Sequence, residues 1–106
     1  MKDLWGKEFS PTEMYKLINL LINAKIPFEV VECYGAPQVC YPSKEKCICD
    51  AVCHGGSYGH TQGLLEIMGL NTDPTDDVEG WLTAEEVYKR ILQDYEKSKG
   101  YIKGRG

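Results

Sequence analysis

Apolar residues recur every three or four positions near the start of the chain, which predicts an amphipathic helix whose stripe faces a core. The stripe consists of Met14, Leu17, Ile18, Leu21 and Ile22. The preceding segment Ser10–Glu13 has the Ser-x-x-Glu spacing of a capping box, with Pro11 at the first helical position. Because Pro27 disfavours helical backbone at the residue before it, we expect the helix to end near Ala24 or Lys25.

After this helix the pattern changes to that of extended chain. Three stretches have the composition and alternation of β-strands, namely residues 28–33, 37–42 and 47–53. The polar segment Ser43–Lys46 separates the last two, which predicts a hairpin with a four-residue turn. These stretches together indicate a three-stranded antiparallel sheet.

The second half of the chain predicts two more helices. The apolar run Leu64–Met68 is followed by Gly69, a residue that commonly ends a helix. Thr83–Glu86 is a second capping box, and the apolar stripe behind it consists of Val87, Tyr88, Ile91, Leu92 and Tyr95. Gly100 is expected to end this helix, so we predict one domain over residues 1–100 and a flexible basic tail over 101–106. The predicted fold is α+β: an N-terminal helix, a three-stranded antiparallel sheet and two C-terminal helices.

Composition narrows the class of protein. A length of 106 residues, with 42% hydrophobic and 26% charged residues, allows one globular domain. The longest aliphatic run, Leu20–Ile22, is too short to cross a bilayer, so no membrane partner is expected. A net charge of −4 argues against binding to the phosphates of duplex DNA. The first residues lack the apolar stretch of a secretory signal, so we expect a protein of the cytosol.

Five cysteines lie within residues 33–53. Their odd number and the absence of a secretory signal argue against a disulfide framework. Cys40, Cys47, Cys49 and Cys53 could hold a zinc ion, with Cys47 and Cys49 on one face of a strand, although their spacing differs from the usual Cys-x2-4-Cys pairs. The same residues could equally be small apolar members of a core.

The loop from residue 54 to residue 63 is the main candidate for a ligand site. It contains both histidines of the protein and four of its glycines, between a predicted strand and a predicted helix. Glycines let backbone amides face a ligand, and a helix N-terminus adds positive potential, so this composition is typical of an anion site. The candidate binding residues are His54, Gly55, Gly56, Ser57, Tyr58, Gly59, His60 and Thr61.

Each residue type in the loop has an expected role. The glycine amides would contact a phosphate group, Ser57 and Thr61 would donate hydroxyl hydrogens, a base would stack on Tyr58, and His54 or His60 would be a cationic partner. The loop is not a Walker motif, since no Gly-Lys-Ser/Thr follows, and its glycine spacing is not that of a dinucleotide fingerprint. In the alternative, structural interpretation the glycines only permit tight turns, Thr61 caps a helix and His54 is a half-buried donor.

No nucleophile, base and orienting group occur together in the sequence. Cys53 and His54 are neighbours on a predicted strand and would point to opposite faces, which makes them a poor catalytic pair. A catalytic pair of Cys53 with His60 is geometrically possible. Asp50 and Glu66 could act as acid or base, although nothing in the sequence pairs them with a nucleophile. We therefore expect a protein that is not an enzyme and uses no cofactor.

The stretches Asp50–Gly59, Gly63–Gly69 and Asp77–Val87 resemble small proteins encoded by bacteriophages and integrated elements of Firmicutes, a group with no settled activity. The resemblance implies an accessory protein made in the cytosol of a bacterial host. By analogy, small acidic phage proteins are often binders, such as inhibitors of host defence, sponges for signalling nucleotides or regulators of another protein.

The expected function is that of a non-catalytic accessory binding protein, of the anti-defence kind, that holds a phosphate-bearing nucleotide in the 54–63 loop. A domain of this size gains a deep pocket most easily between subunits, so we expect a homo-oligomer with Trp5, Trp81 and tyrosines at its interface. One alternative is an inhibitor or regulator of a host protein that uses residues 73–86, which include six acidic and no basic residues. Another is a small zinc-stabilised module.

Overall fold

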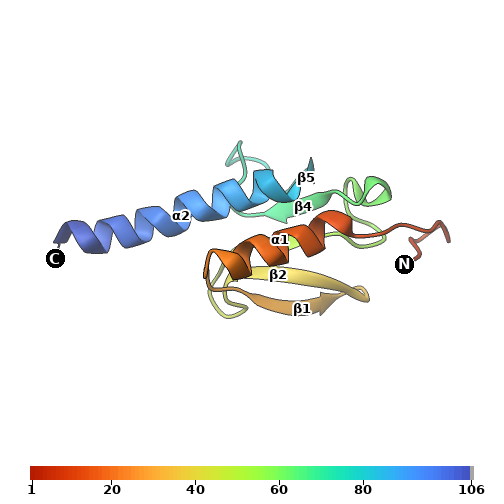
Figure 1. Ribbon diagram of the computed structural model, residues 1–106. Coiled ribbons are helices and arrows are strands. Elements are labelled where there is room, and N and C mark those ends of the chain that lie inside the picture. The colour runs from red at the N-terminus through yellow and green to blue at the C-terminus, as the bar shows by residue number, and fades with distance from the viewer. Residues whose placement is uncertain (106) are drawn as a thin grey trace.

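The computed structural model describes residues 1–105, with side chains through residue 99, and places two helices on one face of an antiparallel sheet (Figure 1). The strands pair in chain order, β1-β2-β3-β4-β5, so the sheet is a meander of neighbouring hairpins. The strands are β1 (Glu29–Cys33), β2 (Ala36–Pro42), β3 (Cys47–Val52), β4 (Leu65–Met68) and β5 (Glu79–Leu82). The helices are α1 (Thr12–Asn23), the short 3-10 helix η1 (His60–Gln62) and α2 (Ala84–Arg105).

The α+β class is confirmed, but the predicted three-stranded sheet with two C-terminal helices is wrong. Residues 65–68 form β4, which pairs with β3 through Ala51 and Ile67, instead of a short helix. Residues 79–82 form the edge strand β5, which the sequence did not indicate. A short apolar run fits a strand and a buried helical turn equally well, and only pairing with a neighbouring strand decides between them.

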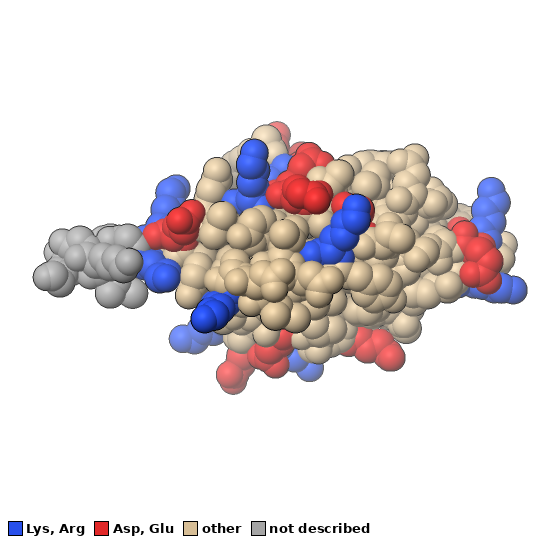
Figure 2. Space-filling model, viewed as in Figure 1, with Lys and Arg blue, Asp and Glu red and all other residues tan. Residues whose placement is uncertain are grey.

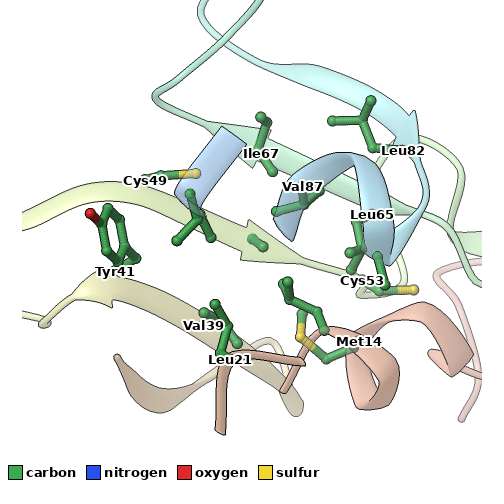
Figure 3. Close-up of a cluster of buried hydrophobic side chains, with 14 of the residues drawn as sticks. Met14, Leu21, Val39, Tyr41, Cys49, Cys53, Leu65, Ile67, Leu82 and Val87 are labelled. Carbon is green, nitrogen blue, oxygen red and sulfur yellow. The ribbon is translucent and has the colours of Figure 1, made fainter. Parts of the chain in front are cut away.

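The core lies between the sheet and the two helices. Figure 3 shows Met14 and Leu21 of α1 and Val87 of α2 packed against strand residues such as Val39 and Ile67, and all five side chains are fully buried. Burial of one such side chain stabilises the fold by about 1.5 to 3 kcal/mol. Ile22, which was predicted to belong to the stripe of α1, is instead exposed. On the opposite, outer surface of this helical layer, basic and acidic side chains are interspersed (Figure 2).

The capping box predicted at Ser10–Glu13 does not form. Pro11 occupies the N-cap position of α1, and no side chain caps this helix. Glu13 is buried, and its Oε1 accepts a hydrogen bond from the amide of Ala84 at 2.9 Å, while its Oε2 lies 3.1 Å from the Lys16 ammonium. The bond from Ala84 is the largest cause that holds the pKa of Glu13 below its usual range. Glu13 therefore caps α2 and joins the N-termini of the two long helices.

The second predicted capping box is confirmed. The Thr83 amide donates to Glu86 Oε1 at 3.0 Å, and the Glu86 amide donates to Thr83 Oγ at 3.2 Å. The helix that follows does not end at Gly100 but continues to Arg105. The basic tail predicted over 101–106 falls on residues whose side chains lie outside the described part of the chain. Over the residues described, neither long helix has the length and apolar character needed to cross a membrane.

Candidate functional site

The glycine-rich loop 54–63 connects β3 to β4 and packs against the first nine residues, which we call the arm. The Leu4 amide donates to the Gly55 carbonyl at 3.4 Å, and a Cβ at position 55 would lie only 2.8 Å from the Asp3 Cα, so this close approach requires glycine. The loop leads into the three-residue η1 instead of the predicted helix. The positive potential expected from a helix N-terminus is therefore not part of this site.

A buried pair, His60 and Asp3, holds the arm on the loop. The His60 ring donates through Nδ1 to the Ser57 carbonyl at 2.7 Å, and its Nε2 lies 3.1 Å from Asp3 Oδ2. A carbonyl oxygen can only accept, so Nδ1 carries the proton of this hydrogen bond. His60 is thus a structural residue of the loop rather than the cationic ligand partner that the sequence predicted.

The carboxylate of Asp3 is fully engaged by protein donors. Its side chain is only 2% exposed, and Oδ1 accepts the amides of Trp5 at 2.9 Å and Lys7 at 2.8 Å in addition to the contact with His60. Burial opposes the charged form, but the bonds from His60, Lys7 and Trp5 together lower the pKa of Asp3. The carboxylate oxygens of Asp3 are therefore occupied by donors of the protein itself.

Hydrogen bonds within the loop occupy several groups that were predicted to bind a ligand. The buried Ser57 hydroxyl donates to the His54 carbonyl and accepts the His54 amide, both at 3.0 Å. The Gly56 amide donates to His54 Nδ1 at 3.1 Å, and the Tyr58 amide donates to Glu66 Oε1 at 3.0 Å. These donors hold the loop in shape and are not free to contact a phosphate group.

Three amides of the loop donate no hydrogen bond to the described part of the protein. Among the residues described, no protein acceptor lies within hydrogen-bonding distance of the amides of Gly55, Gly59 and Thr61. Gly59 is buried and Thr61 is exposed, whereas Gly55 borders a cavity. Of these three amides, that of Gly55 belongs to a residue beside a cavity, in the first part of the loop.

A cavity of about 380 Å³ opens beside this first part of the loop, and we call it the arm pocket. It is lined by Lys2, Asp3, Leu4, Tyr34, His54, Gly55 and Gly56. The sequence indicated the three loop residues but neither the arm residues nor Tyr34 of the β1–β2 turn. These segments are far apart in the chain; the sheet brings Tyr34 beside His54, and the packing of the arm adds Lys2, Asp3 and Leu4.

The residues that line the arm pocket include hydrogen-bond donors. Because His54 Nδ1 accepts the Gly56 amide, the neutral ring carries its proton on Nε2. Burial lowers the pKa of His54, and the nearby Glu66 only partly offsets this effect, so the ring is a neutral donor near pH 7. In the described part of the chain the exposed Lys2 ammonium makes no salt bridge.

Tyr58 does not line the arm pocket and instead belongs to an exposed aromatic pair. Its ring stacks on that of Trp81 in β5, with a centroid distance of 5.2 Å and an interplanar angle of 21°. Sequence reasoning placed Tyr58 in a nucleotide site and Trp81 at a subunit interface, and nothing in the sequence linked the two.

The four cysteines considered as zinc ligands do not share one site. Cys49 and Cys53 are buried in the core, where burial raises the pKa of their thiols to about 12 and about 11. A bulge after Tyr41 changes the strand register, and Cys47 contacts Cys40 instead of lying on the same face as Cys49. Over the described residues, no three His, Cys, Asp or Glu side chains are grouped to hold a metal ion.

The arm pocket and the Tyr58–Trp81 pair both present groups that the fold itself does not use. No protein-family model, curated protein or solved structure matches this chain. Its function is accordingly inferred from the chemistry of these two surfaces.

Proposed function

We propose that this chain is a non-catalytic binding protein whose arm pocket holds a small phosphate-bearing ligand such as a nucleotide. The observation that carries this proposal is the polarity of the lining, in which Lys2, His54 and Gly55 supply donors. The only carboxylate of the lining, Asp3, is already bonded to protein donors. A pocket with unused donors and a satisfied acceptor favours an anion.

The members of the pocket complement different parts of such a ligand. The Lys2 ammonium attracts the charge of a phosphate group, while the imidazole of His54 and the amide of Gly55 provide hydrogen bonds of fixed direction. Tyr34 packs edge-on against His54 at a centroid distance of 5.0 Å and leaves most of its ring exposed, which provides a surface for a base. A cavity of about 380 Å³ falls within the size range of small-molecule sites.

Several observations favour ligand binding without catalysis. Cys53 is buried in the core, the Ser57 hydroxyl is bonded to the backbone of His54, and the His60 ring contacts Asp3. No base therefore stands ready to activate a nucleophile at the arm pocket. The resemblance to proteins of phages and integrated elements supports an accessory role in a bacterial cytosol, and the anti-defence role is added by analogy with small phage proteins.

A ligand panel tests the proposal. Inorganic phosphate, pyrophosphate and cyclic and linear nucleotides should be screened by thermal shift and calorimetry, since a ligand at 100 times its Kd stabilises the folded state by about 2.7 kcal/mol. We expect Lys2→Ala and His54→Ala to lose the shift. Lys44→Ala, at an exposed lysine of the β2–β3 turn, is the matched control and should keep it. No shift across the panel, or an unchanged shift in Lys2→Ala, would contradict the proposal.

A second candidate function is regulation of a host protein through the acidic residues 73–86. The segment before β5 is ordered by its own hydrogen bonds: Asp73 Oδ1 accepts the amide and hydroxyl of Thr75 at 2.9 and 2.7 Å. Asp76 and Asp77 are exposed beside this turn. The specific observation in favour of this candidate is the exposed Trp81, which lies in the same acidic segment.

A further inference from the structure

Charge is divided unevenly along the chain. No lysine or arginine occurs between Cys47 and Tyr88, a segment that contains eight of the 16 acidic residues and therefore carries a charge of −8. The remaining residues contain all 12 basic and eight acidic residues, a charge of +4, which together give the net −4. This acidic segment forms β3, the 54–63 loop, β4 and β5, and it carries the Tyr58–Trp81 pair.

The pair is exposed and held in place. Tyr58 is 53% exposed and Trp81 is 58% exposed, although their rings stack on each other. The Trp81 amide donates to the Tyr58 carbonyl at 3.4 Å, and the Tyr58 amide donates to the carboxylate of Glu66 at 3.0 Å. The two ring faces that remain are thus presented by fixed backbone and lie next to an acidic side chain, so little ordering is needed when a partner binds.

The local backbone is unfavourable where the pairing of β5 with β4 is irregular, between Leu65 and Ile67. Trp81 has a φ of +55°, in the left-handed region that bulky L-residues rarely adopt. A Cβ at Gly80 would overlap the Cβ of Tyr58, so only glycine lets the two segments approach. Neither ring is part of the buried cluster beneath the helices. This combination of strain and exposure indicates that the pair is kept to contact something outside the chain.

We propose that Tyr58 and Trp81 form a docking surface for an arginine-rich segment of a partner protein. The planar guanidinium of arginine stacks on aromatic faces better than the ammonium of lysine. Glu66 beside Tyr58 supplies the opposite charge, and the acidic segment that carries both rings contains no lysine or arginine. The same charges repel the phosphates of nucleic acid, which excludes a stacked base as the occupant. This surface does not depend on the arm pocket. It rests on the second candidate function, regulation of a host protein, and names the kind of segment that the partner would present.

Fluorescence anisotropy with short labelled peptides tests the docking surface on the full chain. The probes are fluorescein-labelled octapeptides that alternate glycine with arginine, lysine or glutamate. The arginine peptide should bind at least threefold more tightly than the lysine peptide, and the glutamate peptide should not bind. Trp81→Ala and Tyr58→Ala should each weaken binding of the arginine peptide at least tenfold. The matched controls Trp5→Ala and Tyr15→Ala remove equally exposed aromatic rings elsewhere and should change it less than twofold.

Each contrary outcome has a definite meaning. Wild-type binding by a folded Trp81→Ala or Trp81→Gly protein would overturn the proposal, and circular dichroism establishes that the variant is folded. Loss of binding in Asp76→Asn with Asp77→Asn, but not in Trp81→Ala, would leave acidic regulation standing and also overturn it. Tighter binding of a labelled single-stranded oligonucleotide than of the arginine peptide would refute the charge argument. Phosphate titration of Trp81→Ala reports separately on the arm pocket.

Discussion

The free-energy cost of the left-handed backbone at Trp81 can be measured by substitution. Its φ of +55° lies where the Cβ of an L-residue crowds the neighbouring carbonyl oxygen. Replacement by alanine and replacement by glycine both remove the ring and its stack on Tyr58, but only glycine also removes the Cβ. The stability difference between the two variants therefore isolates the backbone strain at this position.

The expected magnitude follows from this conformation. One left-handed non-glycine residue costs about 1 to 2 kcal/mol. The greater freedom of glycine in the unfolded chain offsets roughly 0.5 to 1 kcal/mol of the relief. We therefore expect Trp81→Gly to be more stable than Trp81→Ala by about 0.5 to 1 kcal/mol, which raises the melting temperature by about 2 to 6 °C in a domain of this size. Urea denaturation followed by circular dichroism measures the difference.

Tyr15 provides the matched control, because it is an exposed aromatic residue inside α1, where φ is negative. At that position the order should reverse, with glycine less stable than alanine by about 1 kcal/mol. A Trp81→Gly protein no more stable than Trp81→Ala would show that the backbone at Trp81 is not strained. The argument that its ring is presented for binding would then lose its physical basis.

Three further predictions concern the rest of the molecule. The bidentate pair with Arg90 lowers the pKa of Glu79 from 4.5 to about 2, so it stabilises the fold above about pH 4.5 and this contribution is lost as the pH falls toward 2. Glu79→Gln should lower the free energy of unfolding by about 2 kcal/mol at pH 7, after allowance for solvent screening. The stability of this variant should also depend less on pH in the acid range. Ellman's reagent should modify the exposed Cys47 in the native protein but Cys49 and Cys53 only after unfolding; equal rates would contradict their burial. Sedimentation velocity should show a homo-oligomer, since exposed aromatic residues such as Trp5 can line a subunit interface, and a monomer at high concentration would contradict that expectation.

Elements whose signals are local could be predicted from the sequence. The stripe of α1, the hairpin of β2 and β3 and the Thr83–Glu86 capping box each depend on residues within one or two turns of chain. Strand β4 could not, because its apolar run has no distinctive period and only pairing with β3 makes it a strand. Glu13 shows the same limit, since its carboxylate caps a helix 71 positions away.

About half of the arm pocket could be predicted, and for a similar reason. Glycine content and a histidine mark Gly55, Gly56 and His54 in the sequence, but nothing local marks Lys2 or Tyr34. Lys2 reaches the pocket because the buried contact between Asp3 and His60 fixes the arm, and no spacing rule encodes a contact between residues 57 positions apart. Tyr34 reaches it from the β1–β2 turn, where its ring packs against His54. The loop composition also indicated more free amides than the structure offers, because neighbouring side chains accept several of them.

The central claim is that the arm pocket holds a phosphate-bearing ligand between the arm and the first part of the loop. Titration of the ¹⁵N-labelled wild-type protein with inorganic phosphate and a nucleoside monophosphate tests it most directly by NMR. The amide resonances of residues 2–4 and 54–56 should shift together and saturate, whereas those of α1 should stay in place. Shifts confined to other residues, or no shift at millimolar ligand, would contradict the claim.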